Sequence, residues 1–145
     1  MFRQGREVAR RWDIALVVAA GGAVGGGARY LVNEAWPTGP DQFPWQTFVE
    51  NVSGCLLLGA LMVLLLDVWR PTRYGRPFLG VGVLGGFTTF STYTAETDAL
   101  LRHGQVPLAL SYFFGSLAAG LLATWLGLNL TRAAAGISNE SRRIR

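Results

Sequence analysis

The chain has 145 residues and a formal net charge of +4; half of its residues are hydrophobic and 15% are charged. Because a typical soluble domain carries about 25% charged residues, this composition indicates one membrane domain instead of a soluble protein. One histidine and one cysteine, without a cluster of acid, base and nucleophile, argue against an enzyme. The arginines are scattered over segments that flank the apolar stretches and form no stripe with interleaved exposed aromatics, which argues against nucleic-acid binding.

Four apolar spans have roughly the 20 residues that are needed to cross a bilayer. They run from about Ile14 to Val32, Trp45 to Leu66, Phe78 to Leu101 and Val106 to Leu130. We therefore predict an all-α membrane protein with a domain of four transmembrane helices over residues 14–130. Residues 1–13 and 131–145 are predicted to be a basic cytoplasmic N-terminus and a basic C-terminal tail.

The first predicted span is rich in glycine. Gly21, Gly22, Gly25 and Gly26 form two overlapping GxxxG patterns, which allow helix backbones to approach closely. The pattern predicts tight packing within the chain, against a partner, or both. Arg29 lies near the end of this span, where a charged residue is costly and usually purposeful.

The second predicted span contains two adjacent polar residues, Glu50 and Asn51. Polar side chains inside a membrane are usually functional, so Asn51 is a candidate site residue. An interhelical hydrogen bond is an equally good interpretation of it. Neighbours on a helix point about 100° apart, so we expect Glu50 not to line the surface that Asn51 lines. An ion pair or a position near the membrane interface would account for Glu50.

The third predicted span contains glycines, hydroxyls and aromatic rings from Gly85 to Tyr93, and then Glu96 and Asp98. In hydrocarbon every backbone N–H and C=O needs a partner, so an irregular polar segment is tolerated only inside protein or beside a wet or ion-filled path. We therefore predict a broken third helix that forms part of a permeation or binding site.

The fourth predicted span carries Tyr112, Ser116, Gly120 and Thr124 at four-residue intervals, which places them on one helix face. This face forms a polar stripe beside the predicted break. Back-bonding of Ser116 and Thr124 to carbonyls of their own helix is the alternative interpretation.

The arginines are divided unequally between the two sides that four spans would create. Both termini and the second linker hold eleven of the 13, and only Arg29 and Arg102 fall on the other side. Because cytoplasmic segments are enriched in arginine, we predict a plasma-membrane protein with both termini in the cytoplasm. The pI of about 10.0 then reflects topology and attraction to anionic lipid.

Three segments resemble the motifs of a known family. Residues 21–30 are similar to GGxxGAxxRY with one extra glycine, and residues 47–54 to TLxVNxxG. Residues 85–93, followed by Glu96, resemble GGxTTFSTF, which is highly specific. The chain therefore resembles the CrcB/Fluc fluoride channel family over nearly all of its membrane part.

The resemblance implies an antiparallel dimer with two pores that passively exports cytoplasmic fluoride. Broken third helices would cross at the dimer centre, where backbone carbonyls of Gly85 and Thr88 would hold a structural sodium ion. Each pore would present the edges of aromatic rings, which attract a small anion without holding it too tightly. The implied pore-lining residues are Thr47, Asn51, Phe90, Ser91, Thr92, Tyr93, Glu96, Tyr112 and Ser116, with Arg29 at a vestibule.

Two residues depart from the family's pattern. Tyr93 stands in place of a phenylalanine, which keeps the ring edge and adds a hydroxyl that could donate to the anion or narrow the path. Glu50 stands in place of an apolar residue before the amide, and a carboxylate facing an anion path would oppose conduction.

The arginine asymmetry bears on assembly. Eleven arginines against two favour one fixed orientation, so we expect pairing with a related, oppositely oriented subunit, and a homodimer is the alternative.

The pattern of four spans also fits an alternative function, that of a small four-helix multidrug or proton-coupled antiporter. Such a protein needs an acid in the middle of its first span, whereas Asp13 stands at the edge here.

Overall fold

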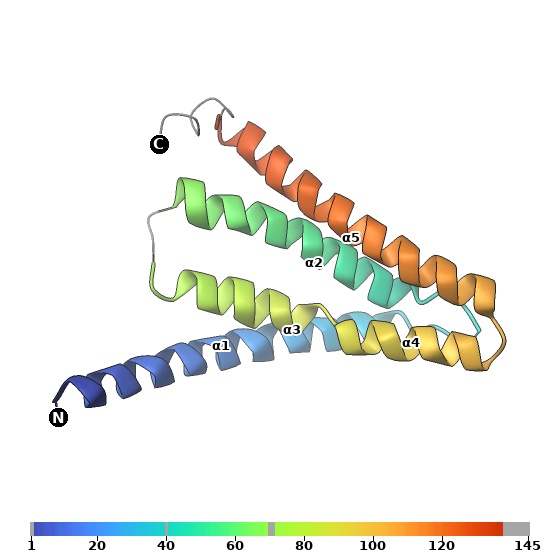
Figure 1. The fold of residues 1–145 in the computed structure, drawn as a ribbon, viewed down its shortest axis with the longest axis horizontal. Coiled ribbons are helices and arrows are strands. Elements are labelled where there is room, and N and C mark those ends of the chain that lie inside the picture. Colours follow the sequence, from blue (N-terminus) through green and yellow to red (C-terminus); the bar gives the residue numbers. More distant parts are fainter. Residues whose placement is uncertain (1, 40, 70–71, 138–145) are drawn as a thin grey trace.

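The computed structural model describes residues 2–39, 41–69 and 72–137 (Figure 1). These ranges contain helices and connecting loops without a strand, as the composition predicts. In chain order the helical segments are α1 (Phe2–Ala35), α2 (Trp45–Val63), the π-helical η1 (Leu64–Val68), the π-helical η2 (Arg76–Leu84), α3 (Gly85–Phe87), α4 (Phe90–Arg102) and α5 (Val106–Ala134).

Three helical stretches in the described ranges are long and apolar enough to cross a membrane: Trp12–Ala35, Trp45–Val68 and Val106–Ala134. They coincide with the first, second and fourth predicted spans. The third predicted span is not one continuous helix, because α3 ends at Phe87 and α4 begins at Phe90. Each of the two resulting pieces is shorter than the roughly 20 residues that cross a bilayer as one straight helix.

The helices lie lengthwise against one another in an elongated bundle (Figure 1). Helix α2 packs along α5, α1 packs along η2 and α3, and α4 contacts α5. The start of α1, the end of η1, the start of η2 and the end of α5 lie at one end of the bundle, whereas the turn between α4 and α5 lies at the other (Figure 1). The break between α3 and α4 falls between these ends.

Close packing of α1 against η2 and α3 depends on glycines from both sides. A Cβ atom on Gly25 would collide with the carbonyl oxygen of Val83, and one on Gly82 would lie 2.8 Å from the Cα of Gly21. A Cβ on Gly86 would lie 3.0 Å from the Cα of Gly22. These contacts leave no room for a side chain, so we call Gly21, Gly25, Gly82 and Gly86 the glycine seam. It explains the GxxxG patterns of the first span by packing within the chain.

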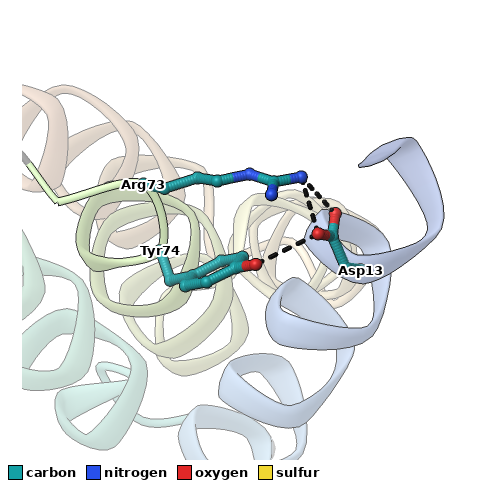
Figure 2. Close-up of polar contacts among 3 residues, drawn as sticks. All are labelled: Asp13, Arg73 and Tyr74. Carbon is teal, nitrogen blue, oxygen red and sulfur yellow. Dashed lines mark hydrogen bonds and ion pairs between the residues drawn. The ribbon is translucent and has the colours of Figure 1, made fainter. Parts of the chain in front are cut away.

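A polar cluster fastens α1 to the segment before η2 at the end of the bundle where α1 begins. Figure 2 shows the Asp13 carboxylate between two side chains of that segment, Arg73 and Tyr74. An Arg73 guanidinium nitrogen lies 2.6 Å from Asp13 Oδ2, and the Tyr74 hydroxyl donates to the same oxygen at 3.0 Å. Asp13 therefore fixes where the chain re-enters the bundle at Arg76.

Candidate functional site

The break between α3 and α4 consists of two threonines in extended conformation. Thr88 has φ −79° and ψ 153°, and Thr89 has φ −142° and ψ 120°. The Thr89 side chain caps α4 by accepting a hydrogen bond from the N–H of Thr92 at 3.1 Å. Threonine is a favoured residue at this position because its oxygen satisfies an N–H that the first turn leaves unpaired.

Asn51 of α2 holds the backbone of the break from the side. Its Nδ2 donates to the carbonyl of Thr89 at 3.0 Å, and its Oδ1 accepts from the N–H of Thr89 at 2.8 Å. One amide side chain thus satisfies both backbone groups of a residue that has left the helix. This arrangement agrees with the interpretation of Asn51 as an interhelical hydrogen-bonding residue. The second N–H of its NH₂ group remains for another acceptor.

These hydrogen bonds change the partners of two carbonyl groups. In an unbroken helix the N–H of Thr89 would donate to Gly85, but here it donates to Asn51. The N–H of Thr92 would donate to Thr88, but here it donates to the Thr89 hydroxyl. The carbonyls of Gly85 and Thr88 therefore lose their helical donors to side chains. Carbonyl oxygens released in this way are good ligands for a hard cation.

An open groove of about 210 Å³ lies between α2, α4 and α5. Its lining contains no charged residue; it consists of Asn51, Cys55, Phe90, Tyr93, Ser116, Leu117, Gly120, Leu121 and Thr124. We call it the three-helix groove. It brings together four of the predicted pore residues, Asn51, Phe90, Tyr93 and Ser116, from α2, α4 and α5.

The hydroxyl oxygen of Ser116, in the three-helix groove, lacks a hydrogen-bond partner among the described residues. Ser116 is only 9% exposed, and this oxygen is buried. Thr124, by contrast, donates to the carbonyl of Gly120 at 3.0 Å, as the back-bonding interpretation has it. A buried hydroxyl without a partner is costly, so the Ser116 hydroxyl is suited to a ligand that enters the groove.

The two aromatic residues of the three-helix groove differ in their exposure to solvent. Phe90 is 75% exposed, whereas Tyr93 is buried. The Tyr93 hydroxyl donates to the backbone carbonyl of Phe113, and the two rings stack with 5.4 Å between their centroids. The added hydroxyl of Tyr93 is therefore directed at α5, and the groove receives the ring.

Three other predicted pore residues form a hydrogen-bonded group beside the groove, which we call the carboxylate cluster. The hydroxyl of Thr47 donates to Glu96 Oε1 at 2.9 Å, and the hydroxyl of Tyr112 donates to Glu96 Oε2 at 2.7 Å. Thr47 and Tyr112 are almost completely buried. Glu96 also lines a cavity of about 150 Å³ toward the loop before α2. The cluster therefore joins α2, α4 and α5 at this end of the site.

The remaining predicted residues lie around the break. The Thr89 hydroxyl oxygen lies 3.3 Å from that of Ser91 and 2.9 Å from that of Thr92. Neither Ser91 nor Thr92 lines the three-helix groove. Gly85 and Thr88 line a second groove of about 270 Å³, which also includes Asn51. Arg29 belongs to α1 and lines none of these spaces.

Two functional positions were absent from the predicted pore residues. Cys55 lines both grooves, and Thr89 caps α4 and binds Asn51. Helical spacing indicates the first, because Cys55 follows Asn51 by four residues and therefore lies on the same helix face. The preference of threonine for helix N-caps indicates the second.

Comparison with known proteins places this geometry in a family. Residues 16–128 match the family model described as CrcB-like protein, Camphor Resistance (CrcB). The chain belongs to this CrcB family. It is therefore a multi-pass membrane protein, in agreement with its membrane-length helices.

Relatives within the CrcB family are similar over most of this chain. Fluoride-specific ion channel FluC 2 of Nocardia farcinica is 49% identical over 127 residues, which are 88% of this chain and 91% of that protein. Fluoride-specific ion channel FluC of Thermus thermophilus is 47% identical over 123 residues, 83% of this chain and 95% of that protein.

Fluoride-specific ion channel FluC 3 of Streptomyces avermitilis is 52% identical over 124 residues, 86% of this chain. The match spans only 61% of that relative's own length. The three relatives are named as ion channels and not as enzymes, in agreement with the prediction from the sequence.

Proposed function

We propose that this chain is a subunit of a fluoride-selective ion channel that exports cytoplasmic fluoride passively. The observation that carries the proposal is the three-helix groove, which offers the unpaired hydroxyl of Ser116 and the second amide N–H of Asn51 without a fixed cation. The names of the relatives support fluoride as the ion.

The chemistry of the groove suits a small anion that must leave as readily as it enters. The edges of the Phe90 and Tyr93 rings carry partial positive charge, and hydrogen-bond donors replace part of the hydration shell. An arginine or lysine in the groove would bind the anion more tightly and slow its release. Fluoride, the smallest halide, accepts the strongest hydrogen bonds, so the same donors favour it over chloride.

Ion efflux from liposomes tests this function directly. Liposomes containing the purified protein are loaded with potassium fluoride or potassium chloride, and efflux is started with a potassium ionophore and followed with ion-selective electrodes. We expect fluoride to leave quickly and chloride to stay, without a requirement for a proton gradient. Equal rates for the two anions would contradict the selectivity.

The segment from Arg76 to Arg102 is proposed to be the fourth crossing of the membrane, as a broken helix. Its two pieces are short, but Asn51 and Thr89 supply partners for the N–H groups of Thr89 and Thr92 and for the carbonyl of Thr89. The carbonyls of Gly85 and Thr88 are left for another partner inside the protein. This proposal also places the ends of the bundle on opposite sides of the membrane. The side that carries most arginines is then cytoplasmic.

A sodium ion held by the carbonyls of Gly85 and Thr88 is also part of the proposal. Support comes from the diverted N–H groups of Thr89 and Thr92, which leave these carbonyl oxygens without their helical donors. The bound ion would supply positive charge that stabilises the exposed ends of the carbonyl dipoles.

Thermal unfolding of the detergent-solubilised protein tests the sodium site. The melting temperature is measured while sodium chloride is titrated at constant ionic strength against N-methyl-D-glucamine chloride. We expect saturable stabilisation by sodium, because a ligand that binds only the folded state raises its stability. A melting temperature that does not depend on sodium would contradict the site.

The proposed assembly is an antiparallel dimer in which this chain keeps one orientation and pairs with a related, oppositely oriented subunit. Support comes from the arginine asymmetry, with eleven on one side against two on the other. To test it, a single cysteine at the C-terminus is labelled from each side of intact cells in a background without Cys55. Labelling from the cytoplasmic side alone is expected, whereas equal labelling from both sides would support a homodimer.

A further inference from the structure

Glu50 occupies an unusual environment that the channel proposal does not use. Its side chain is 1% exposed, and both carboxylate oxygens are buried without a hydrogen-bond partner among the described residues. It belongs to the membrane-length stretch Trp45–Val68, next to Asn51. The ion pair that the sequence suggested is not made through a hydrogen bond to any described residue.

Two charged groups from other helices act on Glu50. Arg29 of α1 attracts the carboxylate, but it donates no hydrogen bond to it, and Glu96 of α4 repels it. Glu96 already receives two hydroxyl hydrogen bonds, from Thr47 and Tyr112. Of the two neighbouring acids, Glu50 therefore lacks the contacts that a buried carboxylate needs.

We propose that Glu50 is a proton-binding site that makes anion passage through the three-helix groove depend on pH. The inference rests on the proposed channel function. Glu50 directly precedes Asn51 in the chain, and Asn51 is one of the residues that line both grooves. As a neutral acid, Glu50 leaves the field of the donors at Asn51 undisturbed. When its proton leaves to solvent, a fixed negative charge stands beside the path and opposes an anion.

The sign of the effect follows from this charge. Fluoride flux is expected to fall as pH rises, because ionised Glu50 repels the anion. At a separation of roughly 12 Å and an effective dielectric constant of about 20, one unit charge changes the population of a nearby anion about tenfold, and a shorter separation changes it more. A glutamine at this position keeps the shape of the neutral acid and cannot ionise.

Fluoride efflux is compared between about pH 6 and about pH 9, a range in which an ordinary exposed glutamate stays ionised. The proteins are the wild type, Glu50→Gln and the control Glu34→Gln, which changes an exposed acid of α1. Protein-free liposomes correct for passage of neutral hydrogen fluoride. We expect flux through the wild type and Glu34→Gln to fall about tenfold with rising pH, and flux through Glu50→Gln to stay level.

The outcomes separate this inference from the proposed function. If Glu50→Gln conducts fluoride with the same pH dependence as the wild type, or the wild type shows no pH dependence, the inference about Glu50 is wrong and the channel function stands. If the folded wild type passes no fluoride at any pH, the channel function is wrong. Glu50→Val, with an apolar side chain, replaces Glu50→Gln if the latter does not fold.

Infrared spectroscopy of the wild-type protein tests the proton without measuring flux. A protonated carboxyl group has a carbonyl band that an ionised carboxylate lacks. We expect this band at neutral pH in the wild type and Glu34→Gln, its loss at higher pH, and its absence from Glu50→Gln. A wild-type spectrum without the band, or one that Glu50→Gln leaves unchanged, would show that Glu50 holds no proton and would overturn the inference.

Discussion

The glycine seam, whose second half lies in η2 and α3, and the break that follows α3 solve opposite problems. At the seam, residues such as Gly25 and Gly82 remove side chains so that two backbones touch. At the break, Asn51 and Thr89 add side-chain hydrogen bonds so that two stretches of helix can separate. The comparison teaches that rigid packing immediately before the break fixes its position, while polar side chains determine its chemistry.

Substitution at the glycine seam is expected to have the largest effect on stability. Gly25→Val would push its side chain into the carbonyl of Val83 and separate α1 from η2, at a cost of about 3 kcal/mol. The matched control is Gly27→Val, since a Cβ on Gly27 meets nothing within 4 Å. Thermal unfolding in detergent measures both variants. Equal stability of the two would break the distinction between the seam and the rest of α1.

The second prediction removes the side chain that holds the break. Asn51→Ala leaves the N–H and the carbonyl of Thr89 without their partner, so we expect a loss of about 2 kcal/mol in stability and about a tenfold loss of fluoride flux. Asn129→Ala is the control, because Asn129 donates to the carbonyl of Trp125 in its own helix. Unchanged flux through Asn51→Ala would mean that the break does not depend on α2.

The third prediction separates ligand binding from stability. Ser116→Ala removes a buried hydroxyl that has no protein partner, so stability should stay within about 0.5 kcal/mol of the wild type. Flux should fall about threefold if the hydroxyl donates to the anion. Ser111→Ala on the exposed face of α5 serves as the comparison. A stable Ser116→Ala variant with full flux would remove this serine from the path.

The smallest effect on stability is expected at the ion pair between Asp13 and Arg73, which lies outside the glycine seam and the break. Asp13→Asn removes the ion pair with Arg73, which is more than one third exposed and therefore screened, so about 0.5 kcal/mol of stability should be lost. Asp98→Asn, which removes the more exposed pair with Arg102, provides a reference close to zero. A loss as large as that of Gly25→Val would show that the seam depends on this anchor.

The sequence was informative where local chemistry decides the structure. Glycines and threonines from Gly85 to Thr89 predict an irregular backbone, and the three continuous apolar spans predict three long helices. The helix α1, however, starts at Phe2, well before the predicted start at Ile14. Arginine and glutamate are good helix formers, so a helix continues beyond the apolar stretch that crosses the membrane.

Contacts between helices could not be predicted from local patterns. Asn51 reaches Thr89 across 38 residues of sequence, and the hydroxyl of Tyr93 reaches Phe113 across 20. The rotation of each helix in the bundle decides these partners, and it also decides that Glu50 is buried. A rule of about 100° between neighbours places Glu50 away from Asn51, but it does not say what fills that direction.

The hydrogen bonds between Asn51 and Thr89 also bear on how the membrane protein is made. The Thr89 backbone has this partner only after α2 has docked, since Asn51 belongs to a different helix. Until then, hydrocarbon offers its N–H no acceptor except a carbonyl of its own segment. In the proposed fourth crossing, the segment from Arg76 to Arg102 should therefore enter the bilayer during synthesis as one straight helix. It then bends when it meets α2, so assembly of the bundle creates the site.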